Sequence, residues 1–404
     1  MIPSSMKQRF IFYFYICLGI SGHPILGPAA NDAAQPPLFN SLIQLDPTIW
    51  ETSPSKFEPL HTKFKFKWVS ATDHETMRSS SRLDFLEYRL YECIARFRED
   101  RLAEVTLLIF SRGDAKKDLG QKEFDELTKQ VESSLDAWLG AKGMDAPLPG
   151  NALETKRKAW FKFPLRVDLE TNFTRNAVDE MTGRRKPRAE FVRLVFTPYD
   201  GKQNTADLVK PNSQSSAQPM AVKRTELKER IKHEEWGDVY LDGVPMVDQG
   251  AKGYCAVASV ERVMRFYGLD FDQNELAKMA NSKTIGGTSQ VEMFDALKKL
   301  GRRFSFTVRE LQRGNDKTKL MRQVTDSVDK GAPLLWGVAL GIVDETPKLP
   351  QANGGHMRLI IGYNKDASEI IYTDSWGAGH EFKRMLLHHA FAITTGLYSI
   401  LPNS

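Results

Sequence analysis

The sequence predicts an α+β fold divided into two domains, and three observations lead to this prediction. The 404 residues are 41% hydrophobic and 10% aromatic, a globular composition in a chain long enough for about two or three domains. Segments that alternate like strands occur beside segments with helical spacing of apolar residues. Residues 201–222 are polar and poor in large apolar side chains, as linkers are. We therefore expect a separate α+β domain before this stretch and a second domain after it.

Residues 1–30 predict a secretory signal peptide. Lys7 and Arg9 provide a positively charged start, the apolar run "FIFYFYICLGISG" follows, and small residues in "ILGPAANDAA" complete the pattern. The apolar run is shorter than the roughly 20 residues that a membrane-spanning helix needs. We therefore expect an exported protein, secreted or periplasmic, that has no stable membrane insertion after the signal is removed.

Charge and cysteine content exclude two classes of protein. The net charge is only +5, from 56 basic and 51 acidic residues that are interspersed, so no broad basic surface for nucleic acid is expected. Without the leader, only Cys93 and Cys255 remain, too few for a scaffold held by disulfides. Cys93 lies among alternating large apolar residues in "LYECIARF", and we interpret it as a buried strand residue.

The first domain, predicted over residues 39–200, alternates strands with one helix. The helix is expected at 121–140, where Phe124, Val131 and Leu135 have helical spacing and a glycine closes the segment. The motif "SRGD" at 111–114 is interpreted as a turn between strand and helix. Strand-like runs are expected at 64–71, 90–97, 101–110, 159–170 and 189–200, with the charged turn "RED" between the second and third. The role of this accessory domain stays open.

Residues 201–235 are predicted to form a polar linker followed by a charged helix at 223–234, and the second domain is predicted over 236–404. In this second domain, "CAVASVERVMRFY" at 255–267 has apolar residues at helical spacing, and Gly268 supplies a left-handed stop. Cys255 then lies in the first turn of a helix, where unsatisfied backbone N–H groups and the helix dipole favour a thiolate. Cys255 is therefore a candidate nucleophile.

A cysteine nucleophile needs a base, usually histidine, and a third group that orients the base. Segments 334–340, 356–364 and 369–377 read as successive strands. His356 opens the second strand and Asp374 ends the third, so pairing of neighbouring strands about 4.8 Å apart could bring the two side chains together. The other histidines have no comparable setting and no fourth ligand at metal-binding spacing. We therefore expect no metal site.

These residues resemble a known family. "QGAKGYC" reads Gln-Gly-x-x-Gly-x-Cys, "DSWG" stands where papain-like cysteine peptidases carry Asn-Ser-Trp-Gly, and the order Gln, Cys, His, Asp is theirs. Asp374 replaces the family's Asn, and the spacing from Cys255 to His356 is shorter than the roughly 130 to 150 residues of papain and the cathepsins. Both departures are similar to the bacterial peptidase C39-like branch. Ala256 stands where papain carries an aromatic residue.

The resemblance implies a papain-like fold over 236–404, with a central helix packed on an antiparallel sheet, and it assigns a role to each matching residue. Cys255 would attack a carbonyl carbon, and His356 would hold the ion pair and protonate the leaving group. Asp374 would orient His356. Gln249 and the backbone N–H of Cys255 would stabilise the oxyanion.

Three further residues have weaker assignments. The resemblance implies that Trp376 covers the pair formed by His356 and Asp374, and that Gly286 and Gly287 let a substrate backbone approach closely. A plain helix-entry turn before Ser289 explains the two glycines equally well.

The resemblance implies an exported cysteine peptidase that acts on a peptide or protein substrate without a cofactor. Two alternatives stay open at this level. The same residues could carry out transglutaminase-like or amidase-like acyl transfer, or the domain could be a catalytically silent peptide-binding module. Substrate specificity and oligomeric state do not follow from the sequence.

Overall fold

The computed structural model describes residues 46–403, apart from 61, 82, 149–154, 178–183, 203–222, 251–252, 270, 272 and 283–286. The predicted signal peptide, most of the predicted linker and Gly286 lie outside these described residues. Within the described part of the chain, no helix is long and apolar enough to cross a membrane.

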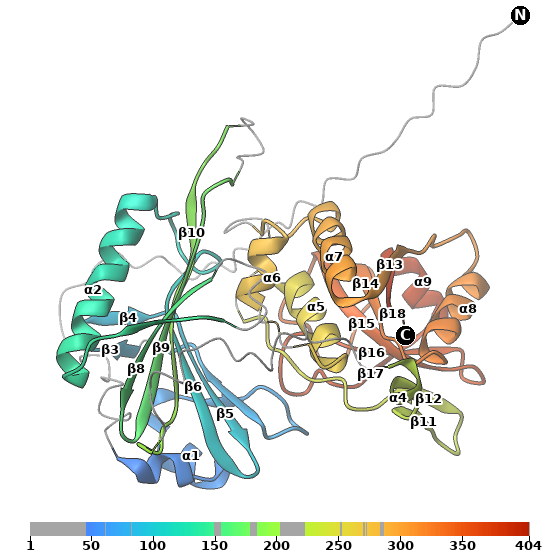
Figure 1. Cartoon of the computed structure of the whole chain (residues 1–404). Coiled ribbons are helices and arrows are strands. Elements are labelled where there is room, and N and C mark those ends of the chain that lie inside the picture. Colours follow the sequence, from blue (N-terminus) through green and yellow to red (C-terminus); the bar gives the residue numbers. More distant parts are fainter. Residues whose placement is uncertain are drawn as a thin grey trace, which may run out of the picture.

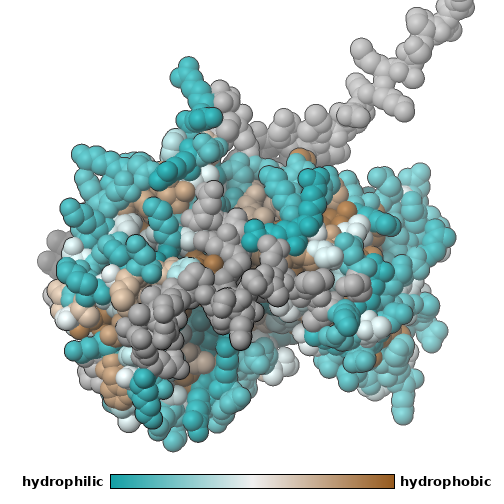
Figure 2. All heavy atoms as spheres, in the orientation of Figure 1, coloured by the Kyte–Doolittle hydropathy of each residue, from teal (hydrophilic) through white to brown (hydrophobic). Residues whose placement is uncertain are grey.

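Figure 1 shows two α+β parts, one in blue to green from the N-terminal half and one in yellow to red from the C-terminal half. Each part has an eight-stranded antiparallel sheet and its own cluster of buried apolar residues. Helices α5 (Cys255–Phe266) and α6 (Gln273–Met279) lie on the side of the C-terminal part that faces the N-terminal sheet (Figure 1). Figure 2 shows a mainly hydrophilic surface in this view, with hydrophobic side chains in small scattered areas.

The N-terminal sheet is antiparallel, and helix α2 (Gln121–Leu139) packs on its β9 and β10 strands. Its strand order is β1 (Lys67–Trp68), β2 (Thr76–Ser79), β5 (Glu92–Arg98), β6 (Arg101–Ser111), β10 (Arg188–Pro198), β9 (Leu165–Thr174), β8 (Lys156–Lys162) and β7 (Met144–Ala146). A separate hairpin joins β3 (Leu83–Phe85) and β4 (Tyr88–Leu90), and the short helix α1 (Pro54–Leu60) precedes the sheet.

Most of the predicted elements of this domain are present. Helix α2 buries the predicted apolar residues and ends at Gly140, which has a φ of 64°. The charged turn joins β5 to β6 through Glu99 and Asp100, both with positive φ. Cys93 is fully buried on β5, which confirms its interpretation as a strand residue in the core.

Three predicted elements are wrong in extent. The strand-like run at 159–170 is divided between β8 and β9, which form a hairpin with its turn at Phe163 and Pro164. The strand expected at 64–71 is a 3-10 turn at Thr62–Phe64 followed by the two-residue strand β1, because Lys65 has a φ of 52° and reverses the backbone. Phe64 and Phe66 are nevertheless both buried, which produces the alternation seen in the sequence. The charged helix expected at 223–234 is only α4 (Arg224–Lys228), because residues 231–233 pair as strand β11 (Ile231–His233) with β12 (Asp238–Leu241).

The C-terminal sheet has the order β11, β12, β15 (Gly354–Asn364), β14 (Leu334–Leu340), β18 (Thr394–Pro402) and β13 (Phe306–Glu310). Strand β16 (Glu369–Thr373) pairs with β15 on one side and β17 (Lys383–Leu386) on the other. The remaining helices are α7 (Gln290–Phe304), α8 (Lys317–Val328) and α9 (Leu387–Ile393).

Helix α5 is the central helix of this domain and packs on β15. Eleven of its twelve residues are buried, so it is enclosed on nearly all sides. It stops before Gly268, which has the predicted left-handed conformation with a φ of 76°. The α+β fold with a central helix on an antiparallel sheet is thereby confirmed.

Candidate active site

Cys255 is the first residue of α5, as the helical spacing predicts, and its side chain is almost completely buried. The backbone N–H groups of Met357 on β15 and of Ala256 lower the pKa of the thiol. Ser259, one turn further along α5, donates a hydrogen bond of 3.2 Å from its hydroxyl to the backbone oxygen of Met357. The nucleophile candidate is therefore fastened to the strand that carries His356.

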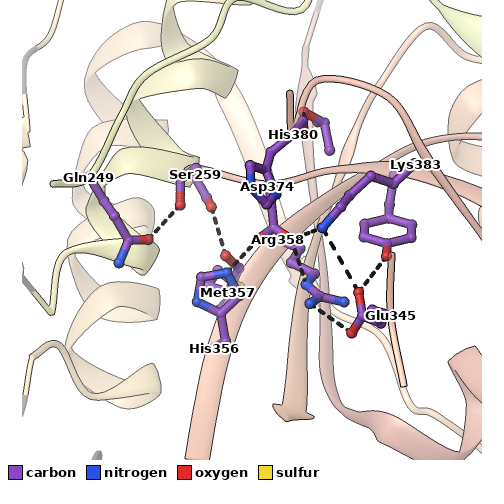
Figure 3. A network of polar contacts seen from close by, with 12 residues as sticks. Gln249, Ser259, Glu345, His356, Met357, Arg358, Asp374, His380 and Lys383 are labelled. Atoms are coloured by element: carbon purple, nitrogen blue, oxygen red, sulfur yellow. Dashed lines mark hydrogen bonds and ion pairs between the residues drawn. The ribbon is translucent and has the colours of Figure 1, made fainter. Parts of the chain in front are cut away.

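His356 and Asp374 meet across neighbouring strands. Strand β15 pairs with β16 in a register that places Leu359 opposite Thr373, so Asp374 follows directly after the last paired residue. The Nε2 atom of His356 lies 2.5 Å from Oδ1 of Asp374, and both side chains are completely buried (Figure 3). The predicted proximity of these two residues is thus seen in the structure.

The second imidazole nitrogen of His356 is the one available to the thiol. Within the described residues, the buried Nδ1 atom has no hydrogen bond that satisfies ordinary geometric limits. The imidazole nevertheless lowers the pKa of the Cys255 thiol, and the thiol raises the pKa of the imidazole. His356 therefore stands between Cys255 and Asp374.

The environment favours a thiolate and imidazolium pair. Burial is the largest effect on Cys255 and opposes ionisation, but the hydrogen bond and the positive charge of His356 outweigh it and lower the pKa of the thiol. Burial also opposes the charge on His356, yet the carboxylate of Asp374 and the interaction with Cys255 raise the pKa of the imidazole to about 9. At neutral pH, the protonated Nε2 of His356 therefore donates a hydrogen bond to Asp374.

Asp374 is held ionised by three cations. Besides His356, the Nε atom of Arg358 lies 3.1 Å from its Oδ2 and the Nζ atom of Lys383 lies 3.3 Å from the same oxygen. Burial opposes the charge on Asp374, but the attraction of Arg358, His356 and Lys383 holds its pKa well below the usual value. Glu345 in turn accepts from Arg358 at 2.9 Å (Figure 3).

Trp376 lies flat against His356. The two ring centroids are 4.1 Å apart and the planes differ by 9°. A stacked indole excludes water from one face of the imidazole, which strengthens the electrostatic interactions of His356 with its partners. This is the position that the sequence resemblance implies for Trp376.

Gln249 is buried beside the "DSWG" segment. Its backbone N–H donates to the backbone oxygen of Ser375 at 2.8 Å, and the hydroxyl of Ser375 donates to Oε1 of Gln249 at 2.7 Å. Because the amide oxygen accepts this bond, the Nε2 donor group is on the other branch of the side chain. The amide is thus oriented with its nitrogen away from Ser375.

Gly287 lies close to the segment before Cys255, since a Cβ atom on Gly253 would be only 3.1 Å from the Cα atom of Gly287. Gly286 lies outside the described residues. Ser289 caps α7 by accepting a hydrogen bond from the backbone N–H of Glu292 at 3.2 Å. The helix-entry turn is therefore present, and the role of the glycines in substrate binding stays a prediction.

Sequence reasoning missed several residues that hold these groups in place. Arg262, two turns after Cys255, donates from Nη1 to the backbone oxygen of Asp374 at 2.8 Å and from Nη2 to the hydroxyl of Thr373 at 2.5 Å. A charged residue inside an apolar helix is a usable signal for such a role. Arg358 could also have been identified from the sequence. It follows the candidate residue His356 by two positions in a predicted strand, so both side chains lie on the same face of that strand. Ser375 and Lys383 gave no comparable signal.

Within the described residues, no three His, Cys, Asp or Glu side chains are grouped so that they could hold a metal ion. The polar groups around Cys255 are instead arranged for proton transfer and for stabilising charge.

Comparisons with known proteins agree with the location of this site. Residues 241–392 match the model of the Peptidase_C39 like family, which confirms the predicted resemblance for this part of the chain. The matched part is less than half of the chain and contains Cys255, His356 and Asp374. No curated protein matches the chain.

Solved structures similar to the chain include three peptidases. One is the peptidase domain of Streptococcus ComA, a bi-functional ABC transporter, at 20% identity over 39% of this chain and 98% of that chain, with a TM-score of 0.29. Xylellain, a cysteine protease from Xylella fastidiosa, has 10% identity over 48% and 94% of the two chains, with a TM-score of 0.33. A double glycine motif protease from an AMS/PCAT transporter, in complex with its leader peptide, has 14% identity over 39% and 91%, with a TM-score of 0.27.

Proposed function

We propose that this protein, whose residues 241–392 match the Peptidase_C39 like family, is a cysteine peptidase that hydrolyses peptide bonds. The arrangement of Cys255, His356 and Asp374 supports the proposal most strongly, because His356 is buried between a thiol and a carboxylate. The Cys255 thiolate attacks the carbonyl carbon and forms an acyl-enzyme. The imidazolium of His356 gives its proton to the leaving amine, and water then hydrolyses the thioester.

Gln249 serves in this proposal as the oxyanion donor together with the backbone N–H of Cys255. The hydrogen bond from Ser375 to its amide oxygen supports this role, because it fixes which side of the amide is the donor. Asp374 orients His356 and stabilises its positive charge, and Trp376 excludes water from the ring. Gly286 and Gly287 are proposed to border the path of the substrate backbone.

Alkylation of Cys255 tests the nucleophile and the base together. At neutral pH the wild type should react rapidly with iodoacetamide, and His356→Ala should react roughly tenfold more slowly, because a free thiol is only a few per cent thiolate at pH 7. In a chain that lacks the predicted leader, and with it Cys17, Cys255→Ser should not be labelled at all, since Cys93 is fully buried. Equal labelling of the wild type and His356→Ala contradicts the ion pair.

The reaction catalysed is tested with a peptide library in the presence of an added primary amine. The proposal predicts cleaved peptides, and their loss in Cys255→Ser. Products in which the amine has joined the acyl group favour acyl transfer on the same residues instead. A wild type that is labelled by iodoacetamide but converts no peptide favours a silent binding module.

We also propose that the protein is exported, to the periplasm or the medium, because residues 1–30 have the pattern of a signal peptide. Cell fractionation followed by intact-mass measurement tests this proposal. The mature chain should be found outside the cytoplasm and should lack the leader. An intact N-terminus in the cytoplasmic fraction contradicts export.

A further inference from the structure

The N-terminal domain contacts the C-terminal domain next to the segment that carries the candidate nucleophile. Four arginines of the N-terminal domain make these contacts: Arg78 with Asp248, Arg112 with the backbone oxygen of Ser282, Arg188 with Asn281, and Arg193 with Glu275. All four partners lie between residues 248 and 282, the part of the chain that includes Cys255 and α6. The four arginines therefore all contact the part of the chain that includes Cys255, and a further contact joins the backbone N–H of Ala71 to Glu381.

Arg78 is the member of this set that contacts the residues on both sides of Gln249, namely Asp248 and Gly250. It is buried on β2, and its Nη1 atom donates to the backbone oxygen of Asp248 at 2.9 Å. The same atom lies 3.4 Å from the carboxylate of Asp248, and Glu92 on β5 pairs with the other side of the guanidinium. A buried guanidinium is stable only when it stays paired with its partners, so Arg78 ties the backbone at Asp248 to the N-terminal sheet.

Two close contacts show how tightly the domains meet here. Gly250 has a φ of 69°, and a Cβ atom at this position would collide with the guanidinium of Arg78. Gly113, in the "SRGD" turn after β6, lies so close to the ring of Tyr254 that a Cβ atom would collide with it. Tyr254 directly precedes Cys255. Both ends of the segment from Asp248 to Tyr254 are thus in contact with the N-terminal domain.

We infer that Arg78 is a positioning residue for the oxyanion-binding segment, so that the N-terminal domain completes the active site of the C-terminal domain. Gln249 is held from two sides: Ser375 binds its backbone and its amide oxygen, and Arg78 binds the carbonyl of the residue just before it. Removing Arg78 frees one side of this support and lets the amide donor move away from the developing oxyanion. The inference rests on the proposed function, because it takes Gln249 as the oxyanion donor.

Two reactions of Cys255 in the full-length protein distinguish an effect of Arg78 on the position of Gln249 from an effect on the Cys255 thiolate. Iodoacetamide forms a carbon–sulfur bond and releases iodide, without any oxyanion. p-Nitrophenyl acetate forms an acetyl thioester and releases p-nitrophenolate through a tetrahedral oxyanion, which the donors stabilise. Both reactions need the thiolate, but only acylation needs Gln249 in position.

The decisive variant combines Arg78→Met with Glu92→Gln, so that no buried carboxylate is left unpaired beside the missing guanidinium. Acylation should slow by about 10-fold or more, since the loss of one oxyanion donor costs roughly 100-fold and a displaced donor less. Alkylation should stay within about twofold of the wild type, because the thiolate is unaffected. Glu92→Gln alone is the matched control, and both of its rates should equal those of the wild type.

Arg78→Lys adds a second test, because it keeps the charge and one donor; its acylation rate should be intermediate. The inference is overturned if the double variant acylates like the wild type, if both rates fall together, or if Glu92→Gln alone slows acylation. The proposed function has a separate readout. A wild type that acylates normally but cleaves no peptide in the library contradicts the peptidase proposal and leaves the result for Arg78 intact.

Discussion

His356 lies within a buried network in which opposite charges alternate. The carboxylates of Asp374 and Glu345 lie between the cations His356, Arg358 and Lys383, and the Cys255 thiol, whose pKa is lowered, lies beside His356. An unpaired buried charge is costly, so each member stabilises the ionised state of its neighbours. Asp374 stands in "DSWG" where papain-like peptidases carry asparagine. Arg358 and Lys383 also pair with this carboxylate, so its negative charge is not directed at the imidazolium alone.

The raised pKa of His356 predicts that two reactions of Cys255 depend differently on pH. The imidazolium is protonated below about 9 and loses its proton above that value. Peptide hydrolysis needs this proton for the leaving amine, so kcat/KM should fall above pH 9. Alkylation by iodoacetamide needs only the thiolate, so its rate should not fall in the same range. Rates measured from neutral pH to pH 10 test this prediction, and parallel profiles would contradict it.

At the scale of elements, α5 and β15 hold the site together from within the core. Ser259 fastens the helix to the backbone of β15, and Arg262 fastens it to Asp374 at the end of β16. The helix thus carries Cys255, the proposed nucleophile, at its first residue and contacts the strand of His356 and the backbone of Asp374 further along. A helix enclosed on nearly all sides can do this because its polar side chains have partners: Ser259 and Arg262 bond to neighbouring strands, and Glu261 pairs with Arg265.

The sequence correctly predicted the structural elements that a short local pattern of residues determines. Helical spacing predicted α2 and α5, and the order of strands brought His356 near Asp374. It failed where the assembled sheet decides: residues 231–233 have a helical pattern but form a hairpin with β12, whose other side is paired with β15. The sequence also did not indicate a role for Arg78, because this role depends on the contact between the two domains. Such contacts do not produce a periodic pattern of residues in a sequence.

Gly250 provides a prediction about one turn of the chain. Gly250→Ala forces a residue with a Cβ atom into positive φ and also into collision with Arg78. Gly243→Ala is the matched control, since Gly243 has a φ of 73° but no atom within 4 Å of the added Cβ. Strain at a positive φ costs about 1 to 3 kcal/mol, so both variants should lose free energy of unfolding, and Gly250→Ala should lose clearly more. Denaturant unfolding measures this difference, and equal losses would show that the contact with Arg78 adds nothing.

At the scale of the whole molecule, two separate apolar cores are joined by a polar contact. The clusters of buried apolar residues belong to different halves of the chain, whereas charged and polar side chains link α6 and residues 248 and 281–282 to the N-terminal sheet. Hydrogen bonds to charged groups contribute about 1.5 to 3 kcal/mol each, and they require accurate geometry. These contacts hold the two domains against each other, which suits the role that we infer for Arg78 in positioning Gln249.

If the contact between the domains is needed for activity, a variant that weakens it should lose activity at a lower urea concentration than it loses its folded structure. Arg112 is buried, and it donates to the backbone oxygen of Ser282. In Arg112→Met, acylation by p-nitrophenyl acetate should be lost at a lower urea concentration than the far-UV circular dichroism signal, because the domains part while both cores stay folded. In the wild type the two curves should nearly coincide.

Arg96→Met is the control, since Arg96 pairs with Glu104 at 2.5 Å inside the N-terminal sheet. This variant should shift the loss of acylation and the loss of the circular dichroism signal to lower urea concentrations together. Coincident curves in Arg112→Met would mean that the contact does not limit the active state, and the N-terminal domain would then have to act on the site in another way.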